Sequence, residues 1–256
     1  MKNKKAVLHI EVIISFSIFI GLLFLIFLMI KPIREPTLSN TVLDVAEAGI
    51  KRDASIALTT FPFAIDIQQN PNNPHTITCF YFENPLNTSI LLPKNVFIKD
   101  VNKNNVAFTF SGRDLYVQKT EADFYYIYYS FDEEFEYIGT TLSQCDKIND
   151  RNQQNQNEQQ EQKDELAFSA PRTQVLFSYN KLLDMHERYY NNYADLKKDW
   201  YLPETSNFAI KIENDDILFE MTRNIPQGKE VFAREFYTYM IKDKKIEQVK
   251  VNLKVW

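Results

Sequence analysis

The sequence predicts an α+β protein in which an N-terminal transmembrane helix and an amphipathic stem helix carry a folded head of two parts. Three observations lead to this prediction. An uncharged apolar run lies near the start, short β-like runs separated by turn residues follow, and a helical apolar stripe precedes four alternating segments at the end. The last part would be a helix packed on a four-stranded antiparallel meander.

The composition excludes several functional classes. The 256 residues suit one large domain or two smaller ones. A formal net charge of −5 gives no reason to expect a nucleic-acid partner. The five glycines form no glycine-rich phosphate loop, and no metal-binding or nucleophile motif can be written. We therefore expect no cofactor, no metal and no enzymatic activity.

The first element is the apolar run from Val12 to Ile30, which carries no charge. A helix of about 20 apolar residues spans the ~30 Å hydrocarbon core of a bilayer, so we expect a transmembrane or assembly helix over 7–31. The lysines before residue 6 outnumber Lys31 and Arg34 after the run. The membrane is thus an expected partner, with the N-terminus cytoplasmic and the head extracytoplasmic.

Glu11 is the unusual residue of this segment, because it stands one position before the uncharged run. A carboxylate at membrane depth costs ~2.5 kcal/mol or more unless it is paired, which makes it a candidate functional group. The simpler alternative is an interfacial glutamate beside Lys4 or Lys5.

The order Lys4-Lys5-Ala6, then Val7, then Glu11, resembles the N-terminus of type IV pilins and pseudopilins. In that family a short basic leader ends in Gly or Ala, prepilin peptidase cuts there, and a Glu is the fifth residue of the mature chain. The resemblance implies a leader over 1–6, a cut between Ala6 and Val7, and an assembly role for Glu11. It covers residues 2 to about 30, and Val7 stands where the family commonly has Phe.

The resemblance also implies partners and a location. They are other pilin-like subunits, prepilin peptidase and the assembly platform, in a cell-surface pilus or a secretion pseudopilus. The ammonium group of Val7 would pair with Glu11 of a neighbouring subunit and select one register. The large head favours a minor, priming or tip subunit. The alternative is a single-pass, signal-anchored binding or receptor protein that does not polymerise.

The next element is a kinked stem helix over 32–60. Pro32 and Pro36 interrupt the first helix, and Ser39 or Asn40 would cap the second. Apolar residues then recur with a helical period up to residue 61, which predicts an amphipathic helix over about 41–60. It would extend the membrane helix or, alternatively, form a surface helix of the head.

A β-rich extracytoplasmic domain is predicted over 61–149, from aromatic and β-branched runs such as 77–82 and 106–110. The run 124–131 is aromatic on both faces, so it is a buried central strand or an exposed tyrosine surface. Cys79 and Cys145 are a possible disulfide worth about 4 kcal/mol, or two buried free thiols. The sequence Asn87-Thr88-Ser89 makes Asn87 a possible N-glycosylation site.

The polar tract over 150–165 contains too little apolar surface to fold alone, so it is a linker or a long surface loop. The final α+β domain covers 166–256. An apolar stripe from Val175 to Leu196 predicts its helix, followed by strands near 208–212, 217–221, 231–241 and 249–255.

Three clusters of polar residues, and His186, are candidates for a cation or metal site. Residues Asp100 to Asn104 lack the turn Gly of a calcium loop, so a hairpin turn is preferred. The acids of 132–134 and 215–216 are expected at solvated strand ends or turns, with a weak cation site as the alternative. His186 lies on the helical stripe, where a half-buried, hydrogen-bonded role is favoured over a metal ligand.

Overall fold

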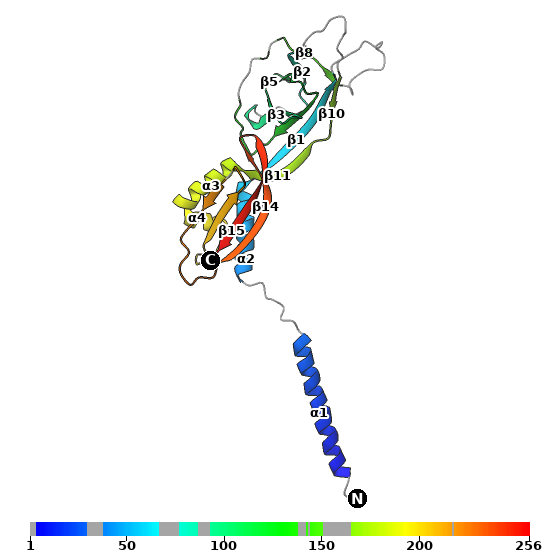
Figure 1. Cartoon of the computed structure of the whole chain (residues 1–256), viewed down its shortest axis with the longest axis vertical. Coiled ribbons are helices and arrows are strands. Elements are labelled where there is room, and N and C mark those ends of the chain that lie inside the picture. The colour runs from blue at the N-terminus through cyan, green and yellow to red at the C-terminus, as the bar shows by residue number, and fades with distance from the viewer. Residues whose placement is uncertain are drawn as a thin grey trace.

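The structure is a computed structural model that describes residues 4–29, 38–66, 77–86, 93–137, 142, 144–150, 165–216 and 218–256. The helices are α1 (Lys4–Met29), α2 (Leu38–Ala54), α3 (Tyr179–Asn191) and α4 (Tyr193–Asp199), with a 3₁₀ turn at Pro93–Asn95. The first strands are β1 (Ser55–Asp66), β2 (Cys79–Glu83), β3 (Val96–Asp100), β4 (Asn105–Val106), β5 (Phe108–Ser111), β6 (Asp114–Gln118) and β7 (Phe124–Tyr129). The others are β8 (Asp146–Lys147), β9 (Asn149–Asp150), β10 (Glu165–Phe168), β11 (Arg172–Ser178), β12 (Phe208–Glu213), β13 (Leu218–Met221), β14 (Phe232–Lys242) and β15 (Lys245–Val255). Figure 1 shows their arrangement.

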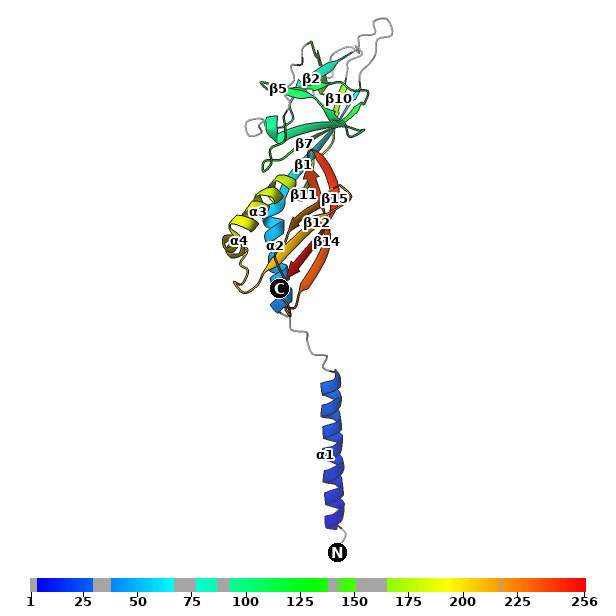
Figure 2. The ribbon, with the colours of Figure 1, turned by 60° about the vertical axis from the view of Figure 1, so that its left-hand side comes forward.

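Helix α1 stands apart from the folded head in Figures 1 and 2. Its side chains are described for residues 13–25. Nine large apolar side chains in this stretch are 47% to 67% exposed, and they point to all sides of the helix. A helix that is apolar all round needs burial against something other than water. No described part of the head provides it.

The predicted transmembrane helix is corrected by the structure. Within the part of the chain that the structure describes, no helix is both long and apolar enough to cross a membrane.

The predicted stem helix is also corrected, because α2 ends at Ala54 and residues 55–60 begin strand β1. In β1, Ile56 and Leu58 alternate with more exposed residues and are fully buried. The segment pairs with β11 along 55–60, and this pairing outweighs its helical apolar period. Helix α2 packs against the head rather than extending α1, since Ala46, Ile50 and Ala54 are fully buried.

An eleven-stranded mixed sheet runs through the whole head. Its main path is β13-β12-β15-β14-β11-β1-β7-β3-β4, and β10 and β9 extend from β1. Strand β1 pairs with β11 through its first half, with β7 from Thr59 to Ala64, and with β10 at its end. We call β2 to β10 the distal module, and α2, α3, α4 and β11 to β15 the proximal module; β1 joins them (Figure 2).

The predicted pair of separate units, an antiparallel head and a C-terminal meander, is therefore wrong. One sheet connects both modules, and β14 pairs with β11 in parallel at Phe177–Met240 and Ser178–Ile241. The last four strands are antiparallel to one another, but β15 returns between β12 and β14 instead of lying at the edge. Its residues Val249, Val251 and Leu253 are buried, which suits a central strand.

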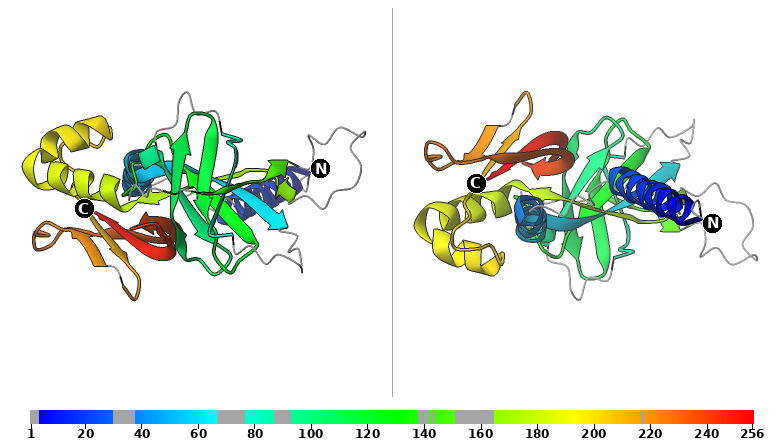
Figure 3. Two further views of the ribbon diagram at one scale, coloured as in Figure 1. Left: turned by 90° about the horizontal axis from the view of Figure 1, so that it is seen from above. Right: turned by 90° about the horizontal axis from the view of Figure 1, so that it is seen from below.

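The core has two large clusters and a small one between them. The distal cluster lies between the main sheet and a second sheet of order β5-β6-β2-β8. Figure 3 shows the molecule from above and from below, with most strands of the distal module in green. The proximal cluster lies between strands β12 to β15 and helices α2, α3 and α4. The small cluster at the junction contains Ile56, Leu58, Phe97, Phe135, Leu176 and Ile241. These contacts connect the modules.

The polar tract falls mostly outside the described residues, but the strands at its two ends are described. Strand β9 before it pairs in parallel with β10 after it, at Asn149–Glu165 and Asp150–Leu166. Both strands belong to the distal module. The chain therefore enters and leaves the tract within one module.

Candidate functional site

The predicted processing and assembly residues lie in the first half of α1. Ala6, Val7 and Glu11 have helical backbone, and their side chains lie outside the described ones. Val7 and Glu11 are four residues apart, which is about one turn of helical backbone.

The described surface of α1 is mostly bulky and apolar, with small residues at Ser15, Ser17 and Gly21. Phe16, Phe19 and Phe24 are 58% to 67% exposed. At Gly21 an added Cβ would have no neighbour within 4 Å. Small residues let helix backbones approach closely, and bulky neighbours then fill the space around them. The helix can therefore offer a close-packed apolar contact on more than one side.

The two cysteines, Cys79 and Cys145, form a disulfide bond with a Cα–Cα distance of 4.7 Å. Cys79 is the first residue of β2 and Cys145 directly precedes β8, and the two strands pair in parallel from Phe80–Asp146. The strand residues after Cys145 reach both sheets of the distal module, because β8 pairs with β2 and β9 with β10. Ile148 lies between these two pairings and is buried in the distal core. The candidate glycosylation residue Asn87 lies outside the described residues.

The other candidate polar residues make contacts that hold turns or pack side chains within the fold. Asp100 accepts hydrogen bonds from the backbone N–H of Asn104 (2.9 Å) and from its Nδ2 (3.2 Å), and so holds a hairpin turn. Asn214 Oδ1 accepts from the backbone of Asp216 (3.0 Å). His186 packs on the rings of Tyr190 and Phe219. Over the residues that are described, no three potential ligands gather as a metal site.

Glu133 departs from its prediction as a solvated acid, because its side chain is buried. Oε2 accepts a hydrogen bond from Ser178 Oγ (2.6 Å), and Oε1 accepts one from Asn180 Nδ2 (2.7 Å). Its backbone oxygen accepts from Asn95 Nδ2 (2.8 Å). Ser178 also caps α3 by accepting from the backbone N–H of Lys181 (3.2 Å). A carboxylate of the distal module is thus fixed at a helix N-terminus of the proximal module.

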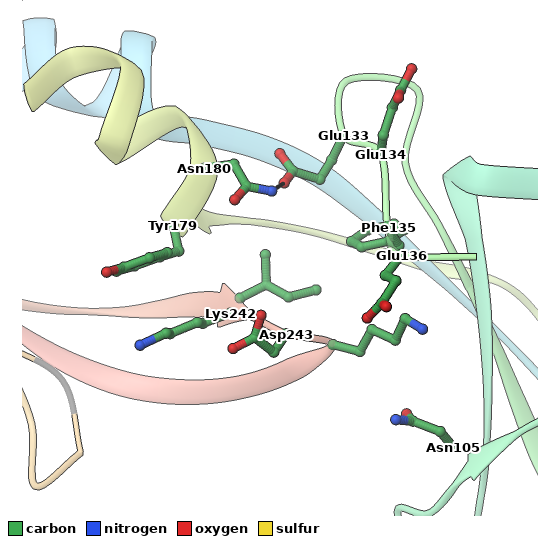
Figure 4. A pocket seen from close by; sticks show the side chains of 11 residues that line it. Asn105, Glu133, Glu134, Phe135, Glu136, Tyr179, Asn180, Lys242 and Asp243 are labelled. Carbon is green, nitrogen blue, oxygen red and sulfur yellow. Dashed lines mark hydrogen bonds between the residues drawn. The ribbon is translucent and has the colours of Figure 1, made fainter. Parts of the chain in front are cut away.

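A pocket of about 280 Å³ adjoins this contact at the junction of the modules. Figure 4 shows the residues 133–136 on one side, Tyr179 and Asn180 of α3 on another, and the β14–β15 turn opposite them. Lys242 lies over the ring of Tyr179 at 4.5 Å from its centre, and Glu134 pairs with Lys94. Because Glu133 is hydrogen-bonded through both oxygens, the pocket offers no free buried base. We interpret it as part of the joint between the modules.

Sequence reasoning missed Glu133 because its partners lie far along the chain. One local signal was present: a Ser at 178, just before an amphipathic stretch, is typical of a helix cap. Val175 and Leu176, expected on the helical stripe, belong instead to strand β11. If the helix had been predicted to begin at Tyr179, its N-terminus would have been a predicted binding place for a carboxylate, because helix N-termini favour negative charge.

Ion pairs hold α2 against the rest of the proximal module. Burial raises the pKa of Asp53, but hydrogen bonds from Arg52 and Trp200 Nε1 (2.7 Å) and the charge of Arg188 outweigh it and lower the pKa overall. The same balance holds at Glu47, where burial is outweighed by Lys51 and Arg234 and the pKa is lowered. Both carboxylates are therefore held in the charged form.

Comparison with known proteins finds no matching family model, no matching curated sequence and no matching solved structure.

Proposed function

We propose that this chain is a pilin-like structural subunit, of the minor, priming or tip type, in a type IV pilus-like filament or a secretion pseudopilus. Its α1 helix packs against the same helix of neighbouring subunits. Prepilin peptidase removes residues 1–6, and Glu11 pairs with the amino group of Val7 in an adjacent subunit. Its partners are other pilin-like subunits and the assembly platform.

The observation that carries the proposal is the exposed apolar surface of α1. Residues 13–25 place nine large apolar side chains at 47% to 67% exposure. Removing apolar surface from water contributes about 25 cal/mol per Å², so burial of this helix between copies is strongly favourable. Burial in a helical core also makes an unpaired Glu11 costly, and this gives the Val7–Glu11 pair its role in register.

A second support is the arrangement of the head. Helix α2 packs firmly in the proximal module and passes directly into β1, which leads on into the distal module. The folded part thus follows α1 along the chain as one unit (Figure 1). The Cys79–Cys145 bond suits an oxidising compartment, which agrees with a head outside the cytoplasm.

Cysteine cross-linking tests the packing of α1. The only two cysteines of the chain are bonded to each other, so an engineered Phe16→Cys would be the only free thiol. Mild oxidation of assembled material should give disulfide-linked dimers. The matched control is Lys103→Cys on an exposed hairpin of the distal module. Equal dimer yields from the two variants would contradict packing through α1.

Glu11→Ala tests the pairing. It should reduce the yield of filaments while leaving the folded head intact, because it removes the partner of the Val7 amino group. Glu121→Ala, which removes an exposed carboxylate of the distal module, serves as the control. A normal filament yield from Glu11→Ala would refute the role of this residue.

A further inference from the structure

Two hairpin turns, one from each module, meet at the pocket of the module junction. The β3–β4 hairpin of the distal module carries Lys99 and Lys103, and the β14–β15 turn of the proximal module carries Lys244 and Lys245; we call these four the lysine cluster. Lys99 pairs in register with Asn105, so their side chains share one face of the sheet. Asn105 lines the pocket together with Lys244, and Figure 4 shows Asn105 near the β14–β15 turn.

The positive charge of the lysine cluster has no ion-pair partner. Among the ion pairs of the described residues, none involves any of the four lysines. Burial lowers the pKa of Lys99, and the charges of Lys245, Lys244 and Lys103 lower it further. Asp100 acts in the opposite direction, but its carboxylate already accepts two hydrogen bonds within the hairpin turn. The four ammonium groups therefore repel one another across the junction.

Two other carboxylates, those of Glu136 and Asp243, line the same pocket. Neither forms an ion pair with a lysine in the part of the chain that the structure describes. Because they are fewer than the lysines of the cluster, the junction keeps an excess of positive charge.

The backbone supplies an independent sign that these lysines have a role. Lys103 has φ of 67° and Lys244 has φ of 63°, a region that glycine adopts most readily. Lys242 pairs with Lys245, so Asp243 and Lys244 are the two central residues of a tight turn, where Asn-Gly is the preferred pair. A lysine at positive φ is unfavourable for the backbone. Its presence in both turns points to a use for the side chain.

A complementary negative surface exists on the same chain. The distal module, from Cys79 to Phe168, contains 15 acidic and 8 basic residues, and two of those basic residues belong to the lysine cluster. Exposed carboxylates such as Glu83 and Asp146 take part in no ion pair of the described residues. Each copy thus carries a positive site at the junction and an acidic surface elsewhere on the head.

We infer that the lysine cluster binds the acidic distal module of an adjoining copy of this chain. This contact rests on the proposed function, because it needs assembled subunits, and it adds a contact between heads to the packing of α1. The two surfaces differ, so the contact is heterologous, and heterologous contacts that do not close into a ring generate open helical filaments. Opposite charges also fix the register of the two partners.

Carbodiimide cross-linking of assembled full-length chain tests the contact. The reagent activates a carboxylate, and a lysine amine that touches it displaces the reagent to form an amide. Material assembled from equal amounts of ¹⁴N and ¹⁵N chain gives linked peptides with one half of each isotope only when two copies are joined. These mixed links should connect the lysine cluster to carboxylates of the distal module. Lys229 and Lys254, two exposed lysines outside the cluster, are the internal controls and should give none.

A variant makes the test specific. Lys244→Gly removes one charge and keeps the turn, because glycine readily adopts a φ of 63°. It should reduce the mixed links from Lys99 and Lys245 at least about threefold, the effect of losing one exposed charge contact. Lys254→Gln should leave them unchanged. Unchanged links in Lys244→Gly, or mixed links from the cluster to another part of the chain, would overturn the inference.

Dimers of Phe16→Cys, formed in parallel, separate the two levels of the proposal. If these dimers form through α1 while the lysine cluster gives no mixed links, the contact between heads is wrong and the proposed function stands. If neither the dimers nor the mixed links form, both are refuted.

Discussion

Glu133 and Ser178 are 45 residues apart in the sequence, and the hydroxyl of Ser178 donates a 2.6 Å hydrogen bond to the buried carboxylate of Glu133. This contact joins the distal module to the first turn of α3 in the proximal module. Beside it, Phe135 packs with Phe97 and Ile241 in the small cluster at the junction. The relative position of the two modules therefore depends on a polar contact and an apolar one next to each other.

Glu133→Ala should destabilise the head by about 1–3 kcal/mol, because it leaves the Ser178 hydroxyl and the Asn180 amide without their acceptor. Glu134→Ala removes only an exposed ion pair with Lys94 and should cost less than about 1 kcal/mol. Urea unfolding of both variants measures the difference. Equal losses would show that the Glu133 contact does not stabilise the junction.

Gly49→Ala should destabilise the head by at least about 1–3 kcal/mol, because the added Cβ would overlap the buried ring of Trp200. This glycine allows α2 to approach the end of α4 closely. Gly21→Ala on α1 is the matched control, since its Cβ would meet no atom within 4 Å. Thermal unfolding of the head should shift in the first variant only, and a wild-type transition in Gly49→Ala would contradict the close approach.

The paired substitution Cys79→Ser and Cys145→Ser should lower the free energy of unfolding by about 4 kcal/mol in the chain-entropy account of a disulfide. Hydrogen exchange should show lost protection first in β2 and β8, next to the bond, while β12 to β15 stay protected. A reducing agent should have the same effect on the wild type and none on the variant. Uniform loss of protection over both modules would argue against a local role.

Acid should weaken the attachment of α2. The folded-state pKa of Asp53 lies below its ordinary value of 3.8, so the unfolded chain takes up the proton first as the pH falls. The stabilisation is thus complete above about pH 4 and is lost as the pH falls through the folded-state pKa. Asp53→Asn should be less stable at neutral pH and lose less stability between pH 5 and pH 2 than the wild type.

Urea midpoints across this pH range measure the effect, with the exposed Asp132→Asn as the control. If Asp53→Asn and the wild type lose stability in parallel on acidification, Asp53 is not the titrating group.

The sequence predicted best where it left only two alternatives and the structure shows one of them. The run Phe124–Tyr129 lies between β1 and β3 with Tyr125 and Ile127 fully buried, as expected for a central strand, although its other face is only partly buried. The structure joins Cys79 to Cys145, which the sequence offered as one of two alternatives. Both features depend on local composition or on a small number of possible pairings.

Prediction from the sequence failed where a segment fits both the helical and the strand period. It also failed where the partners of a residue or strand lie far away along the chain. Residues 55–60 fit a helical period as a continuation of α2, but Ile56 and Leu58 fit the two-residue period of a strand equally well. The choice is made by pairing with β11, more than 100 residues later. The burial of Glu133 and the central place of β15 likewise arise from tertiary contacts, which no local pattern encodes.

The mass of the mature N-terminal peptide, measured on the chain purified from its own cells, tests the proposed function most directly. Processing by prepilin peptidase predicts that the peptide begins at Val7, with Glu11 as its fifth residue. A mature chain that still begins with the residues before Ala6 would contradict the proposal and favour a protein that does not polymerise.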